Sequence, residues 1–123
     1  MHRTTLAGLH AGKDIWTLMR EVELPDHLYV GQAYGKVSWC VRATWESYLG
    51  WFKGDHTSDL YATPPHRVFG ELVELAGIEA VVARGRAKLA GGDVEAANLL
   101  AEAALEADPV SYTHLTLPTK RIV

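Results

Sequence analysis

A chain of 123 residues with 48% hydrophobic and 22% charged residues fits at most one modest domain, and its composition is that of an ordinary soluble globular protein. Its formal net charge of −3 argues against nucleic acid as a partner. No apolar run approaches the roughly 18 residues that a membrane-spanning helix needs, and one cysteine cannot form an intrachain disulfide, so the compartment stays open between cytoplasm and periplasm.

Two short helices are predicted near the N-terminus, over residues 4–10 and 14–21. In the second, apolar side chains recur at spacings of three and four residues, namely at Ile15, Leu18, Met19 and Val22. Asp14 is suited to cap the first turn of this helix, and Pro25 ends the pattern. We expect the following stretch, residues 24–35, to be a loop or a strand-like connection.

A longer helix is predicted over residues 36–49, because one stripe of side chains follows the helical period. The stripe contains Val37, Cys40, Val41, Thr44, Trp45, Tyr48 and Leu49. We therefore expect Cys40 to be a buried structural thiol and Tyr48 to belong to the core. Trp39 falls off the stripe, so we expect it to pack against a second surface or to face a pocket.

Three further helices are predicted after a polar loop, over residues 65–77, 78–90 and 93–107. Pro65 suits the first position of a helix, and Asp93 is a suitable cap. The predicted fold class is therefore all-α. The last two helices form a hairpin with the outline of a tetratricopeptide unit, and one such unit cannot bury its own apolar face.

Six histidines prompt a search for a metal site. Asp55, His56, Asp59 and His66 lie within twelve residues, but on a polar loop that lacks the short, repeated spacings of metal ligands. Solvated side chains account for them better. The segment GQAYGK also lacks the spacing of a phosphate-binding loop. We predict no catalytic residue and no metal ligand in this chain.

An apolar ligand cavity is the remaining candidate site. Its wall would come from the aromatic residues Tyr34, Trp39, Trp45, Tyr48, Trp51 and Phe52. Lys36 or Arg42 would supply positive charge for an anionic head group. Helical periodicity assigns Trp45 and Tyr48 to the core. It does not decide whether Trp39 and Trp51 belong to the core or to a pocket.

The order of four segments resembles the alkyl sulfatase family, and specifically its dimerisation domain. The segments are LMREVELP, VGQAYGKVSWCVRATWESYLGWF, LVELAG and the helical pair that ends in ALEADP. The similarity covers about residues 5–108. It implies a homodimer, and a parent hydrolase of the metallo-β-lactamase type in which a zinc-binding catalytic domain precedes this segment and a sterol-carrier-like domain follows it.

The resemblance also implies what this chain lacks. The H-x-H-x-D-H cluster that holds two zinc ions is absent, so zinc is implied for the parent enzyme only, and we expect this segment to be inactive alone. In many members a histidine thought to reach the sulfate pocket follows Y-G-x-x-S, and Trp39 stands in its place. Trp51 replaces a tyrosine twelve positions further on. Tyr34, Trp39 and Trp51 are therefore the predicted substrate-contacting residues.

The composition changes abruptly at Pro109. Residues 110–123 contain three threonines, Lys120 and Arg121 but no acidic residue, so residues 1–108 alone carry a formal charge of −5. The tail resembles the translation of a sequencing adaptor, and we expect it to be disordered. We predict a dimerisation domain over residues 1–108, truncated at both ends, and an artefactual or disordered tail over residues 109–123.

The leading hypothesis is a segment whose helices pair two protomers and whose aromatic corner at Trp51 caps the pocket of a neighbouring catalytic domain. Two alternatives stay open. Residues 78–107 could be a tetratricopeptide-like module that binds another protein, although the sequence has no second copy of the repeat. The loop around His56 and His66 could serve a small enzyme.

Overall fold

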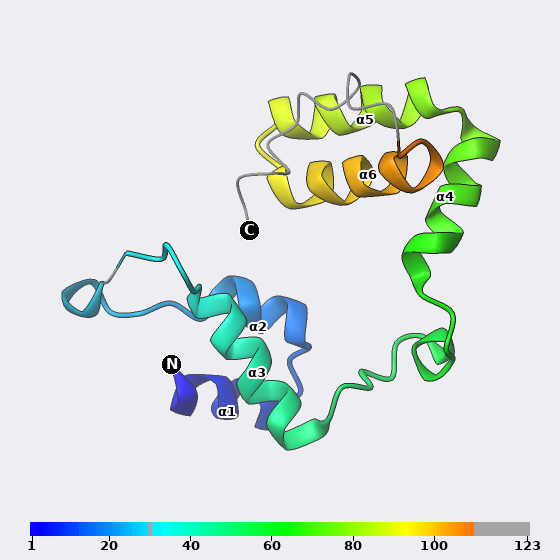
Figure 1. Cartoon of the computed structure of the whole chain (residues 1–123). Helices are drawn as coiled ribbons and strands as arrows, with labels where there is room; N and C mark the ends of the chain where they lie inside the picture. Colours follow the sequence, from blue (N-terminus) through cyan, green and yellow to red (C-terminus); the bar gives the residue numbers. More distant parts are fainter. Residues whose placement is uncertain (30, 110–123) are drawn as a thin grey trace. The chain divides into compact units, whose positions relative to one another are not determined.

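The computed structural model describes residues 1–29 and 31–109, and in this part of the chain every regular element is helical (Figure 1). The helices are α1 (His2–His10), α2 (Ile15–Glu21), η1 (Asp26–Leu28), α3 (Val37–Leu49), η2 (Thr57–Leu60), α4 (Pro65–Ala76), α5 (Ile78–Ala90) and α6 (Val94–Ala107). The predicted all-α class is confirmed. The elements form two compact units, Met1–Tyr61 and a second that begins at Ala62.

The first unit is held together by a small core between α2 and α3. Its buried side chains are Ile15, Leu18, Val22, Val41 and Trp45. Helix α1 packs against this core through Gly8, because a Cβ atom at that position would overlap the side chain of Leu18. The absence of a side chain at Gly8 therefore allows the Leu18 side chain to pack directly against the backbone of α1.

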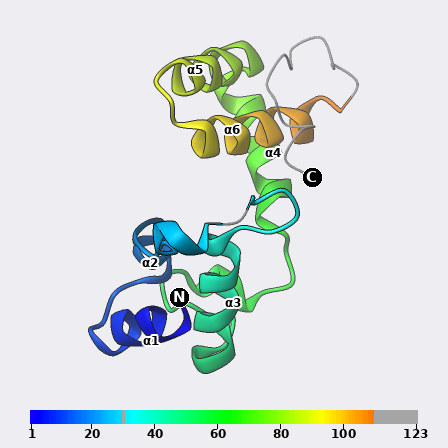
Figure 2. The same cartoon turned by 90° about the vertical axis from the view of Figure 1, so that its left-hand side faces the viewer.

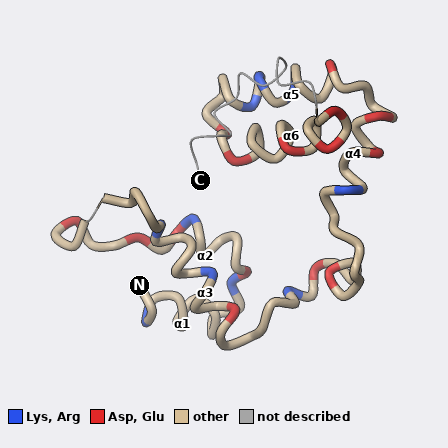
Figure 3. The backbone as a smooth tube through the Cα atoms, in the orientation of Figure 1, with Lys and Arg blue, Asp and Glu red and all other residues tan. Residues whose placement is uncertain are grey.

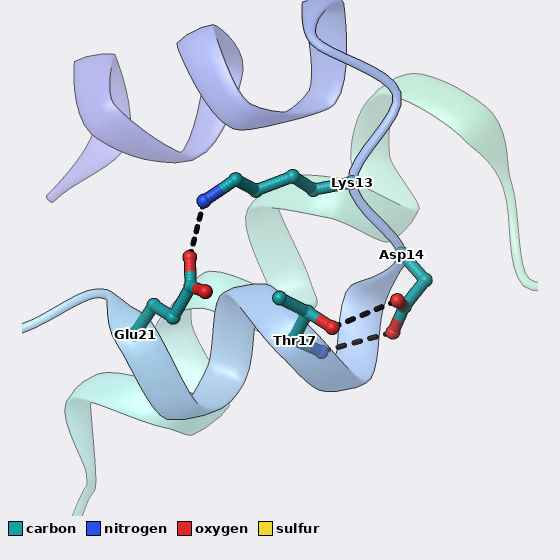
Figure 4. A network of polar contacts seen from close by, with 4 residues as sticks. All are labelled: Lys13, Asp14, Thr17 and Glu21. Carbon is teal, nitrogen blue, oxygen red and sulfur yellow. Dashed lines mark hydrogen bonds and ion pairs between the residues drawn. The ribbon is translucent and has the colours of Figure 1, made fainter.

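Helix α2 begins with the cap that the sequence predicts. The carboxylate of Asp14 accepts hydrogen bonds from the backbone N–H of Thr17, at 2.9 Å, and from the Thr17 hydroxyl, at 2.8 Å (Figure 4). These two bonds favour the charged carboxylate, and they lower the pKa of Asp14 below its ordinary value. The side chain of Lys13 extends along α2 and pairs with Glu21 at the other end of this helix (Figure 4).

Two predicted loops contain short 3₁₀ helices. η1 lies in the stretch predicted as a loop or strand-like connection, and η2 lies in the polar loop before α4. Each is too short to show the periodicity from which a helix is predicted, so the sequence gives no signal for them.

The buried side of α3 is narrower than the stripe predicted from the sequence. Val41 and Trp45 are buried, but Cys40 is exposed and Tyr48 is 58% exposed. The predictions of a buried Cys40 thiol and a core Tyr48 are therefore wrong. The helices that pack against α3, α1 and α2, are short, so side chains at the margin of the stripe and at its C-terminal end stay in contact with solvent.

In the second unit, α5 and α6 lie side by side and α4 packs against α6 (Figures 1 and 2). Asp93 caps α6, because its carboxylate accepts a hydrogen bond of 3.2 Å from Ala96 N–H. A Cβ atom at Gly70 would lie 3.3 Å from the backbone of Glu106, so α4 and α6 cross almost backbone to backbone. The helical hairpin is confirmed, whereas its identity as a tetratricopeptide unit stays a prediction.

The predicted domain boundary between residues 108 and 109 also stays a prediction. The tail assigned to residues 109–123 lies, beyond Pro109, outside the described residues.

Candidate functional site

The second unit has a groove between α4, α5 and α6 with a volume of about 460 Å³. Every residue that lines it is apolar: Phe69, Leu72, Val73, Ala76, Val81, Ala96, Leu99, Leu100 and Ala103. Such a groove offers no hydrogen-bonding group to orient a polar substrate. It is suited to bind another apolar surface.

The apolar surface continues from the groove onto the outer side of α4. Val68, Leu72 and Leu75 follow one another at intervals of four and three residues and are 42%, 55% and 85% exposed. We call these three residues the α4 row. Leu72 belongs to both the row and the groove, so the two form one continuous surface. Apolar surface of this kind, exposed on a helix that already packs elsewhere, indicates a protein interaction site.

A polar contact links α4 to α6 at one side of this unit. His66 at the start of α4 has its Nε2 atom 3.5 Å from Glu102 Oε2 on α6, and the His66 ring lies edge-on to Phe69 with 5.2 Å between ring centroids. Asn98 also donates a hydrogen bond of 3.0 Å to Glu102. These contacts fix the end of α4 next to α6 and so help to hold Phe69 at the groove.

The three predicted substrate-contacting residues are all exposed but do not come together. Tyr34 is fully exposed, Trp39 is 48% exposed and Trp51 is 60% exposed. Trp39 lies in the first turn of α3, and Trp51 follows its C-terminal end, so the length of the helix, about 18 Å at 1.5 Å per residue, separates them. None of the three lines either of two pockets of the first unit, one beside α2 and the start of α3 and the other beside the C-terminal end of α3.

A cluster of charges around Trp16 was not predicted. The Arg42 guanidinium lies 5.9 Å from the centroid of the Trp16 ring, and Lys53 Nζ lies 5.8 Å from it. Glu46 binds both cations, at 2.9 Å from Arg42 Nε and 3.7 Å from Lys53 Nζ. The spacing of Arg42 and Glu46 on one helix was visible in the sequence, but their approach to Trp16 depends on how α2 packs against α3.

Zinc, which the family resemblance implies for a parent enzyme, does not fit the residues present. Within residues 1–29 and 31–109, no group of three or more histidine, cysteine, aspartate or glutamate side chains is placed to hold a metal ion. The residues Asp55, His56, Asp59 and His66 therefore do not form such a group. In the same ranges, no helix is long and apolar enough to cross a membrane.

Comparison with known proteins identifies the family. Residues 16–116 match the family described as alkyl sulfatase dimerisation, which is more than half of the chain. The chain belongs to this family. The match extends beyond Pro109 into the segment interpreted as a translated adaptor, and that interpretation remains a prediction.

One curated relative supports this assignment. The alkyl sulfatase dimerisation domain described here is 35% identical over 98 residues to a linear primary-alkylsulfatase of Pseudomonas sp. (strain ATCC 19151). The aligned region covers 76% of this chain and 17% of that protein. No solved structure matches the chain. The family is named for dimerisation.

Proposed function

We propose that this segment binds a second copy of itself and thereby joins two subunits of a zinc-dependent hydrolase of the alkyl sulfatase type. The observation that carries the proposal is the continuous apolar surface formed by the groove and the α4 row. The family description supports a second copy as the occupant.

Burial of this surface supplies the driving force. Leu72, Leu75 and Leu99 are between 46% and 85% exposed in the single chain. Complete burial of a leucine side chain contributes about 1.5–3 kcal/mol, so removing the exposed parts of three leucines from water contributes several kcal/mol per copy. The groove also provides space into which side chains of the second copy pack.

The catalytic part of the parent protein is the second proposed partner. The segment spans 17% of the curated relative, which is named for alkyl sulfate hydrolysis, and we assign the zinc ligands and the hydrolytic step to the remainder of the parent chain. Tyr34, Trp39 and Trp51 are proposed to contact the substrate next to that catalytic domain. Their exposure supports this role, because it leaves an aromatic surface at each position free to contact another domain.

Two substitutions of equal size and exposure test the proposed association. Leu72 is 55% exposed on the α4 row, and Leu60 is 54% exposed in the first unit. We expect Leu72→Glu to abolish dimerisation of the full chain, since it places a charge in the apolar contact, and Leu60→Glu to leave the dimer intact. Light scattering after size exclusion measures the mass of each. Equal masses for the two variants would contradict the proposed surface.

A further inference from the structure

Helix α4 carries three different surfaces. The α4 row lies along its outer side, and residues 69, 73 and 76 line the groove on one flank of that row. Arg67, Glu71 and Glu74 occupy the opposite flank, again at intervals of four and three residues, and all three are exposed. These positions follow from the rotation of about 100° per residue in a helix with 3.6 residues per turn.

The order of these surfaces distinguishes the two symmetric ways in which two copies of α4 can face each other. In a parallel pair, the two-fold axis runs along the helices, and each apolar flank lies against the charged flank of the other copy. In an antiparallel pair, the axis is perpendicular to the helices, so like flanks meet. Only the antiparallel pair brings the two grooves together and leaves the charged flanks together at the rim.

The charges on the second flank favour the same arrangement. Arg67 lies in the N-terminal part of α4, and Glu71 and Glu74 lie nearer its C-terminal end, as the blue and red segments of this helix in Figure 3 show. Reversing the direction of one copy places Arg67 of each copy beside Glu74 of the other, and these two favourable pairs oppose one approach of the two Glu71 side chains near the axis. In a parallel pair, each charged flank would instead lie against the apolar groove flank of the other copy, which buries these charges without partners.

We propose that α4 pairs antiparallel with α4 of a second copy across a two-fold axis near Leu72, with Val68 of one copy opposite Leu75 of the other. The inference rests on the proposed function and adds the element and the direction of the contact. The helix dipoles of the two copies also oppose each other favourably in this arrangement.

Disulfide trapping in the full chain tests the direction. Each variant carries Cys40→Ser, because Cys40 is exposed and would react. A disulfide requires Cα atoms within about 7 Å. The antiparallel pair therefore predicts a linked dimer when Val68→Cys and Leu75→Cys chains are mixed, several times more than either chain forms alone. Leu72→Cys, near the axis, links to its own copy. Glu79→Cys, on the side of α5 away from the groove, is the control, because its yield of linked dimer measures random collisions between chains.

Each outcome of this experiment is decisive. Efficient linking of Val68→Cys and of Leu75→Cys to themselves, without a gain on mixing, indicates a parallel pair and overturns the inference. A chain that is dimeric by mass but links at none of these positions places the interface elsewhere and also overturns it, without affecting dimerisation itself. A chain that is monomeric at all concentrations overturns the proposed function as well.

Discussion

Gly8 of α1 lies directly against the side chain of Leu18 in α2, and a Cβ atom at Gly8 would overlap Leu18 Cδ2. Leu18 is 2% exposed, so its side chain is enclosed by the core. We therefore expect Gly8→Ala to destabilise the first unit by about 1–3 kcal/mol, the usual cost of overpacking. Urea unfolding followed by tryptophan fluorescence measures the change.

Gly31→Ala is the matched control for this substitution. A Cβ atom at Gly31 would meet no atom within 4 Å, so we expect the control to unfold like the wild type. A Gly8→Ala variant as stable as Gly31→Ala would show that α1 does not pack against Leu18 as described.

The positions of the helices could be predicted because the signals for them are local. The burial of individual side chains could not be predicted in the same way. Asp14, Pro65 and Asp93 mark helix starts by the chemistry of their own turns, and the structure confirms all three. The exposure of Cys40 depends instead on which helices cover α3, and sequence periodicity does not contain that information. For the same reason, residues 65–77 were predicted to be a helix, but the sequence did not show which of its apolar side chains stay exposed.

Cys40 should react with a maleimide reagent in the folded chain. Its side chain is exposed on α3, so no unfolding is needed for access. We expect the rate in native buffer to be similar to the rate in urea, after correction for the effect of urea on a small thiol. A reaction rate several orders of magnitude lower in native buffer than in urea would show that Cys40 is buried, as predicted from the sequence.

Trp16 should contribute to stability through its two cations. Exposed cation–π contacts contribute about 0.5–1 kcal/mol each, so we expect Trp16→Leu to cost about 1–2 kcal/mol beyond the change in apolar area. Trp39→Leu is a suitable control, since Trp39 is similarly exposed and lies 6.0 Å from one cation, Lys36 Nζ. Thermal unfolding compares the two variants, and an equal loss for both would contradict a special role for Trp16.

The cap at Asp14 should make α2 sensitive to acid. Because hydrogen bonds from Thr17 lower the pKa of Asp14 in the folded chain, its contribution to stability is complete above the unfolded pKa, near 3.8, and is lost as the pH falls through the folded pKa. We expect Asp14→Ala to be less stable than the wild type at neutral pH, with the difference shrinking below about pH 4.

Asp14→Asn provides the control for titration. It retains an oxygen that accepts the Thr17 N–H bond but carries no charge, so its stability relative to Asp14→Ala should not vary with pH in this range. The free energy of unfolding as a function of pH separates the two effects. A difference between wild type and Asp14→Ala that is constant down to pH 2 would contradict the lowered pKa.

Sedimentation equilibrium of the full chain over a wide range of concentrations tests the central claim most directly. The chain has a mass of 13.5 kDa, so the dimer and the monomer are easily distinguished. We predict that the wild type approaches twice this mass as its concentration rises and that Leu72→Glu stays monomeric throughout. A wild-type chain that remains monomeric at every concentration, or a Leu72→Glu variant that dimerises equally well, would contradict association through the apolar surface of α4.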